Sequence, residues 1–96
     1  MKITELRESM TFLDVEAVVV GIEEREVNTK AGEKILLQKT ELSDDTGEIT
    51  LTTWGTKYQK ILEKGNRLKI TGAYTKSWNG QLSLNISRAG GIVKTN

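Results

Sequence analysis

The sequence predicts an all-β fold, a small five-stranded barrel with one short helix between the third and fourth strands. Short runs of alternating apolar and polar residues recur along the chain, and turn residues separate these runs. A single segment, residues 56–65, instead places its apolar residues at helical spacing. With 96 residues the chain forms one domain, 1–96, with one modest core. Short antiparallel strands bury their edges only when the sheet closes on itself, which favours a barrel.

The first half of the chain contains two long predicted strands. Apolar and polar residues alternate over 14–27, and Gly21 interrupts this run, as expected for a strand that bends between two sheets. A turn at 28–32 leads to a second strand over roughly 34–42. The N-terminal segment 3–9 precedes them as a helical turn or a strap.

The third predicted strand covers residues 48–54, and the alternation along it predicts which face each side chain takes. It follows a strong turn signal, Ser-Asp-Asp-Thr-Gly, at 43–47. Ile49 and Leu51 point to one face, and Trp54 points to the other. We therefore expect Trp54 on the outer face of the barrel.

The predicted helix follows this strand. Tyr58, Ile61 and Leu62 fall on one helical face, Thr56 is a suitable N-cap and Gly65 a suitable C-terminal stop. We expect this helix to plug one open end of the barrel and to place Tyr58 in the core.

Two further strands, 67–75 and 81–88, are joined by the turn at 78–80, and the chain is expected to fray from Ala89 onward. The resulting order, β-β-β-α-β-β, is that of the OB fold, a five-stranded Greek-key barrel.

The face taken by Tyr74 is open from the alternation alone. Tyr74 shares the parity of Leu68 and Ile70, which favours the core. A bulge at Gly72 would reverse the parity and turn Tyr74 outward. We favour the bulge and an outward Tyr74.

Charge and aromatic residues are distributed unevenly along the chain. Residues 1–50 carry 6 Lys and Arg against 12 Asp and Glu, whereas residues 51–96 carry 8 against 1. Every Trp and Tyr lies in this basic second half. Flat π faces beside dispersed cations suit a groove for single-stranded nucleic acid, because rings stack on bases and cations hold phosphates.

Several functions are excluded or disfavoured by composition. The chain has no Cys and no His, which excludes a disulfide framework, a thiolate or imidazole metal site and a Ser-His or Cys-His nucleophile pair. It also shows no signal peptide and no apolar run of membrane-spanning length. We expect a cytoplasmic binding domain that is not an enzyme, with no metal, no cofactor and no membrane partner.

Three signatures carry a resemblance to a known family. They are a D-x-T-G turn leading to a strand that ends in W-G, within 43–55, a second segment over 63–70, and an aromatic-x3-aromatic-x-G pattern within 73–85. Together they resemble the single-stranded-DNA-binding OB domains of archaea, including archaeal replication protein A and the simple archaeal single-stranded-DNA-binding proteins. The resemblance extends from about Ile3 to Gly91.

The resemblance implies a binding site. Three aromatic residues, Trp54, Tyr74 and Trp78, match the positions that stack on successive bases in the family. Lys30 matches a basic residue of the first loop that approaches the strand, and Arg25 is a weaker match of the same kind. From its place among the rings, Lys76 is expected to hold phosphate with Lys30.

The sequence departs from the family at two places. Metazoan relatives carry a further aromatic where this chain has Asn85, and many simple members carry a long tail, whereas this sequence stops at Asn96. The chain is then either one module of a longer protein or a short stand-alone form, and its oligomeric state stays open.

Three functions are compatible with these observations. The leading hypothesis is sequence-tolerant binding of single-stranded DNA in replication, recombination or repair, alongside replication or repair proteins. The second is an OB domain that binds RNA or tRNA, because nothing in the sequence reveals a 2′-OH contact. The third is an OB subunit whose exposed rings dock a protein.

Overall fold

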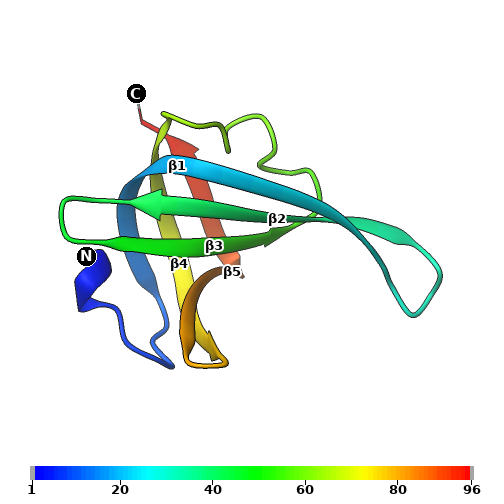
Figure 1. The fold of residues 1–96 in the computed structure, drawn as a ribbon, viewed down its shortest axis with the longest axis horizontal. Helices are drawn as coiled ribbons and strands as arrows, with labels where there is room; N and C mark the ends of the chain where they lie inside the picture. Colours follow the sequence, from blue (N-terminus) through cyan, green and yellow to red (C-terminus); the bar gives the residue numbers. More distant parts are fainter. Residues whose placement is uncertain (1, 96) are drawn as a thin grey trace.

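The computed structural model describes residues 2–95, without the side chains of Trp78 and Arg88. A short 3-10 helix, η1, precedes five strands that close into a barrel in the order β1-β2-β3-β5-β4 (Figure 1). The elements are η1 Ile3–Glu5, β1 Leu13–Asn28, β2 Lys34–Ser43, β3 Glu48–Trp54, β4 Arg67–Trp78 and β5 Gln81–Lys94. The predicted all-β barrel of the OB type is therefore confirmed. No helix within residues 2–95 is long and apolar enough to cross a membrane.

The core is built from the inward-facing residues of every strand. β3 shows the pattern most clearly, since Ile49, Leu51 and Thr53 are buried while Glu48 and Trp54 are exposed. The same alternation buries residues of the other strands, including Val15, Leu42, Ile70, Leu84 and Ile92. The outer face of the barrel is thereby left to the intervening residues.

Two bulges reverse the alternation partway along their strands. In the β1–β2 ladder the register shifts between Val19 and Gly21, where the sequence predicts a bend. In the β4–β5 ladder it shifts between Thr71 and Ala73, around Gly72, whose φ is +64°. A one-residue shift moves every following side chain to the opposite face.

The hairpin of β1 and β2 extends well beyond the barrel, as Figure 1 shows. Its paired residues run to Asn28 and Lys34, and a turn at 29–33 closes it. Near the barrel, the buried Gln38 donates a hydrogen bond to the Glu24 carboxylate at 3.0 Å. The hairpin thus forms an arm that projects past the end of β3 (Figure 1), whose last residue Trp54 pairs with Leu37 of β2.

The prediction of a helix between the third and fourth strands is wrong. Residues 55–66 form a series of turns, in which the amides of Gln59 and Ile61 donate to the carbonyls three residues earlier. Only Leu62 donates across a full helical turn, to the Tyr58 carbonyl. Leu62 is buried and Tyr58 packs partly against the core. The helical spacing therefore predicted that Leu62 and Tyr58 turn toward the core, but it did not predict the backbone. The segment is too short to offset the cost of nucleating a helix.

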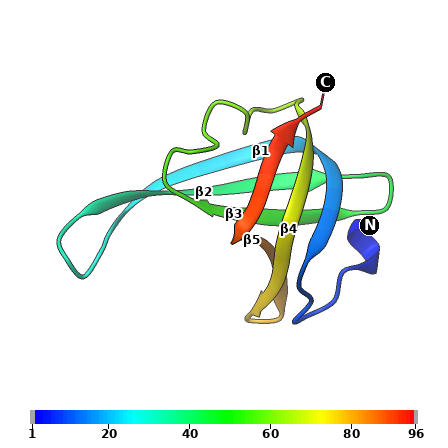
Figure 2. The ribbon, with the colours of Figure 1, turned by 180° about the vertical axis from the view of Figure 1, so that it is seen from behind.

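The expectation of a fraying end from Ala89 is also wrong. β5 continues to Lys94, and Ile92 lies opposite Ile70 with 5% of its surface exposed. β5 runs beside β4 (Figure 2), and their register shifts around Gly72, where Thr71 pairs with Gly91 and Ala73 with Ile86. Gly90 allows the two strands to approach closely, because a Cβ on this residue would lie 2.6 Å from the Thr71 carbonyl oxygen.

The D-x-T-G turn clamps the N-terminal strap. The Asp44 carboxylate accepts hydrogen bonds from the amides of Ile3, Thr46 and Gly47 and from the Thr46 hydroxyl. Desolvation alone would raise the pKa of Asp44, but these hydrogen bonds outweigh it and lower the pKa to about 2. This motif, which carries much of the family resemblance, thus has a structural role at one end of the barrel.

Candidate nucleic-acid interface

The strand register aligns the outward residues of β1, β2, β3, β5 and β4 in rows across the barrel. Directly opposed residues share a face, so each row is one line of neighbouring side chains. The first row is Glu23, Lys39, Thr52, Asn85 and Tyr74, the second is Gly21, Glu41, Thr50, Ser83 and Lys76, and the third is Arg25, Leu37 and Trp54. These rows define a surface, which we term the outer groove, that joins residues far apart in sequence.

Trp54 ends β3 on this surface and leaves 56% of its area exposed. It lies opposite Leu37 of β2, and Gly55 follows with φ +87°, where the backbone turns away from the sheet. The outward orientation agrees with the alternation of β3. A large ring exposed to this degree offers one open face for stacking.

Tyr74 also points outward, because the bulge at Gly72 reverses the alternation of β4. Ile70 and Ala73 are both buried, so the residues on either side of the bulge face inward and Tyr74 faces out, 37% exposed. The Ser87 hydroxyl donates to the Gly72 carbonyl at 2.6 Å and secures the bulge.

The two rings line one hollow of about 370 Å³. Its lining residues come from β3, the following turns, β4 and β5: Thr52, Thr53, Trp54, Lys57, Tyr58, Tyr74, Asn85, Ile86, Ser87 and Gly90. The Lys57 ammonium sits 5.3 Å from the centroid of the Tyr58 ring, which holds a cation at the rim. We call this the ring hollow.

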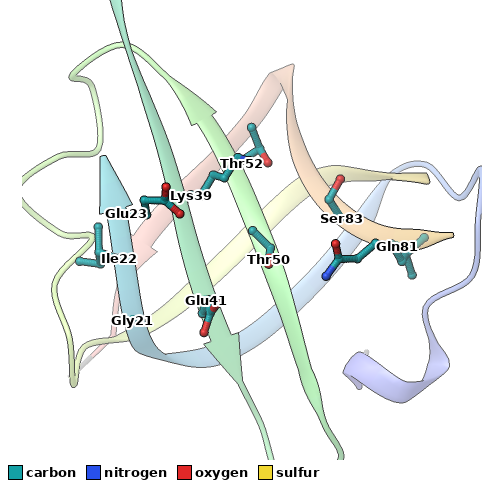
Figure 3. Close-up of a pocket in the computed structure, with 10 residues that line it drawn as sticks. Gly21, Ile22, Glu23, Lys39, Glu41, Thr50, Thr52, Gln81 and Ser83 are labelled. Carbon is teal, nitrogen blue, oxygen red and sulfur yellow. The ribbon is translucent and has the colours of Figure 1, made fainter. Parts of the chain in front are cut away.

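A larger hollow of about 540 Å³ adjoins it and shares Thr52 (Figure 3). Its lining residues are Gly21, Ile22, Glu23, Lys39, Glu41, Thr50, Thr52, Gln81, Leu82 and Ser83. It contains no aromatic residue and several polar ones, so we call it the polar hollow. The outer groove therefore has two adjoining parts with different chemistry.

The predicted basic residues are not all close to these hollows. Lys76 is exposed on β4 opposite Ser83, within the rows of the groove. Arg25 lies in the same row as Trp54, with its guanidinium 3.7 Å from the Glu23 carboxylate. Lys30 is exposed in the turn at the tip of the β1–β2 hairpin, beyond the body of the barrel (Figure 1).

Trp78 ends β4 opposite Gln81, but its side chain lies outside the described part of the structure. Asn79 and Gly80 both have positive φ, as the expected two-residue hairpin turn requires. A stacking role for Trp78 therefore stays a prediction.

Comparison with known proteins assigns the chain to a family, although no family model matches it. It is 32% identical over 85 residues, 88% of its length, to the single-stranded DNA binding protein Ssb of Saccharolobus solfataricus. It is also 28% identical to the second OB-fold domain of replication protein A from Methanococcus maripaludis, with a TM-score of 0.75, and the match covers all of this chain and 96% of that one. The chain belongs to the archaeal single-stranded-DNA-binding protein and replication protein A family of OB domains.

The fold of this OB domain agrees with a further structure, the OB domain of Ta0387 from Thermoplasma acidophilum. The TM-score is 0.83 at 23% identity, over the whole of this chain and 86% of the other. The chain spans 56% of the length of the Saccharolobus relative. The family is one of DNA-binding proteins rather than enzymes. Within residues 2–95 no three acidic side chains gather in a way that could hold a metal ion.

Sequence reasoning missed several residues of this OB domain's groove. Lys39 and Glu41 face the polar hollow, and Lys57 and Asn85 line the ring hollow. No hydrophobic alternation in the sequence could place the first two, because Gln38 and Thr40, which alternate with them, are polar although both are buried. For Asn85 the signal was its alternation with Leu84, which is fully buried.

Proposed function

We propose that this domain binds single-stranded DNA along the outer groove, with bases stacked on Trp54 and Tyr74. The observation that carries the proposal is that two outward rings from different strands line one hollow. Neither ring belongs to the buried core, and both line the same space. The family relationship favours single-stranded DNA as the ligand.

Each stacked base contributes about 1–3 kcal/mol, as judged from alanine substitution in other single-strand binders. Trp78 is proposed as a third ring at the end of β4. Stacking tolerates any base, because every base has a π face. The domain therefore binds without a strict sequence requirement, and one OB fold covers roughly 4–16 nucleotides.

Cations around the rings hold the phosphates. We assign this role to Lys57, which lines the ring hollow, and to Lys76 on β4. Arg25, two strands from Trp54 in the same row, is a third candidate. Lys30 would contact the DNA only where the strand continues along the hairpin. We propose that the domain serves replication, recombination or repair together with the proteins of those processes.

A fluorescence titration tests the proposal. Tryptophan emission should fall as oligo-dT is added at low salt and should recover as salt is raised. A Trp54→Ala variant then shows how much of the fluorescence quenching and of the affinity for oligo-dT depends on the Trp54 ring. Absence of binding to oligo-dT at low salt would refute the proposal, whereas tighter binding to a matched RNA would identify RNA as the ligand.

A further inference from the structure

The polar hollow has a floor of small side chains and walls of charged ones. Thr50 of β3 and Ser83 of β5 lie side by side at its centre, and Gly21 of β1 adds no side chain at all. Figure 3 shows Glu41 and Lys39 on β2 along one side and Gln81 on β5 pointing toward Thr50 from the other. A space of about 540 Å³ bounded in this way can admit a flat polar group, but offers it no ring to stack on.

Glu41 is an unexpected residue in a groove for a polyanion. It lies between Gly21 and Thr50 in its row, and its carboxylate oxygen lies 3.6 Å from the position that a Cβ on Gly21 would take. Among the described residues no cation or hydrogen-bond donor pairs with it. Because like charges repel, a phosphate over Glu41 is disfavoured, and the part of a strand that passes here must be a base.

Lys39 supplies the complementary charge. It lies two residues before Glu41 on the same face of β2, so the two Cα atoms are roughly 7 Å apart along the strand. Its neighbours across the sheet are Glu23 and Thr52, and no ion pair holds its ammonium group among the described residues. The hollow therefore presents a strong acceptor and a strong donor side by side.

A pair of this kind can distinguish pyrimidines by their polar edges. Cytosine carries an amino group at C4, which donates to a carboxylate, and acceptors at N3 and O2, which suit an ammonium group. Uracil and thymine carry a carbonyl oxygen at C4, which the carboxylate repels. Their one edge donor, the N3–H, lies between two carbonyl oxygens, so a carboxylate that accepts from it also meets an oxygen on each side. Stacking alone cannot make this distinction, since it depends on the π face rather than on the edge.

We propose that the polar hollow is a base-reading subsite in which Glu41 accepts from the cytosine amino group while Lys39 donates to the same base. The inference rests on the proposed function, because the base must be delivered by a strand held on the rings. The ring hollow and the polar hollow share Thr52, so a strand stacked on Trp54 can continue into the subsite.

The test compares oligomers of deoxycytidine and deoxyuridine of equal length. These bases differ at C4, which carries an amino group in cytosine and a carbonyl oxygen in uracil, and at N3, which carries a proton only in uracil. Neither base has the methyl group of thymine. Wild-type protein should bind the cytosine oligomer about fivefold more tightly, the low end for one good edge contact. In Glu41→Gln the ratio should fall to within about twofold, because an amide can accept from cytosine or donate to uracil.

Glu16→Gln is the matched control. Glu16 is exposed on β1 opposite Lys69, outside both hollows, and its substitution makes the same change in net charge. Both affinities should rise equally in this variant, and the ratio should stay at the wild-type value. Lys39→Gln should reduce the ratio while weakening binding to both oligomers.

The outcomes separate the two proposals. If wild-type protein binds neither oligomer, binding of single-stranded DNA itself is refuted. If it binds both equally, or if Glu41→Gln strengthens both by one factor and keeps the ratio, Glu41 acts as a repelling charge only and the base-reading subsite is refuted.

Discussion

Trp54 combines a large exposed ring with a fixed position at the end of a strand. Because 56% of its surface is already exposed, truncation should remove little packing energy from the folded state. We predict that Trp54→Ala raises the dissociation constant for oligo-dT by a factor corresponding to about 1–3 kcal/mol. Its melting temperature should stay within about 4 °C of wild type, since surface substitutions usually change stability by at most about 0.5 kcal/mol.

Phe12→Ala provides a control for the loss of an exposed ring. Phe12 is 90% exposed and lines neither hollow. Its affinity for oligo-dT, measured by anisotropy of a labelled strand, should equal that of wild type. Equal losses of affinity in Phe12→Ala and Trp54→Ala would contradict a specific stacking role for Trp54. So would a cooperative melt of Trp54→Ala shifted down by clearly more than about 4 °C.

At the scale of elements, the bulge in β4 decides which side of the barrel Tyr74 occupies. A Cβ on Gly72 would lie 2.7 Å from the Gly90 Cα, and φ at Gly72 is +64°. We predict that Gly72→Ala lowers the free energy of unfolding by roughly 2–4 kcal/mol, from backbone strain and from the clash. Urea unfolding of the variant and of wild type measures this difference.

Gly32→Ala separates the two causes of this loss. Gly32 also has a positive φ, +80°, but nothing lies within 4 Å of its Cβ position. Its loss should be only about 1 kcal/mol, the cost of the backbone conformation. Equal decreases in the free energy of unfolding for Gly72→Ala and Gly32→Ala would show that the close approach of Gly72 to Gly90 adds nothing to the cost of the substitution.

The strands were predictable because their signal is local, whereas other elements depended on tertiary contacts. Period-2 alternation and the turn at 43–47 placed β3 at 48–54, as observed. The segment after it carried helical spacing but folds as turns, which are enough to bury Leu62 and to pack Tyr58 and Ile61 partly against the core. The end of β5 lacked an alternating pattern near Gly90 and Gly91, and only pairing with β4 makes it a strand.

The hydrogen bonds to the Asp44 carboxylate predict that the free energy of unfolding depends on pH. The pKa of Asp44 is about 2 in the folded protein, below its ordinary value of 3.8, so the carboxylate stabilises the folded state above pH 3.8. This contribution is lost as the pH falls toward 2. Asp44→Asn should therefore lower the free energy of unfolding by about 1–2 kcal/mol at pH 7 and by much less near pH 2.

Asp45→Asn is the matched control for the clamp. Asp45 forms an exposed ion pair with Lys2 at 2.6 Å, and exposed pairs contribute about 0–1 kcal/mol. Denaturant unfolding at several pH values should show a larger loss of stability at pH 7, and a larger change of that loss with pH, for Asp44→Asn than for Asp45→Asn. A constant difference from pH 7 to pH 2 would contradict the role of the Asp44 charge.

At the scale of the whole molecule, the barrel mixes the acidic and basic halves of the sequence. The predicted separation of charge along the chain does not become two faces, because β1 and β2 bring Glu23 and Glu41 into the same groove as Lys76. Alternation could place Trp54 outward, but the rows that join β2, β3, β5 and β4 depend on the register between strands. The polar hollow was therefore not predictable from sequence.

This mixing sets how strongly salt should weaken binding. The chain carries a formal net charge of only +1, so the salt-dependent part of the affinity must come from cations along the groove and its hairpin arm, namely Arg25, Lys30, Lys57 and Lys76. Each phosphate contact on a single strand contributes a slope of about −0.7 in a plot of log affinity against log salt concentration. We predict a slope no steeper than about −3 for oligo-dT.

Substitutions on one strand test the origin of this slope. Lys76→Gln should make it shallower by about 0.7, since it removes one phosphate contact. Lys69→Gln, on the same strand but opposite Glu16 and outside both hollows, should leave it unchanged. Both variants lose one positive charge, so any effect of net charge alone appears equally in each. Equal slopes for the two variants, both shallower than wild type, would show that the field of the whole molecule, rather than contacts in the outer groove, attracts the strand.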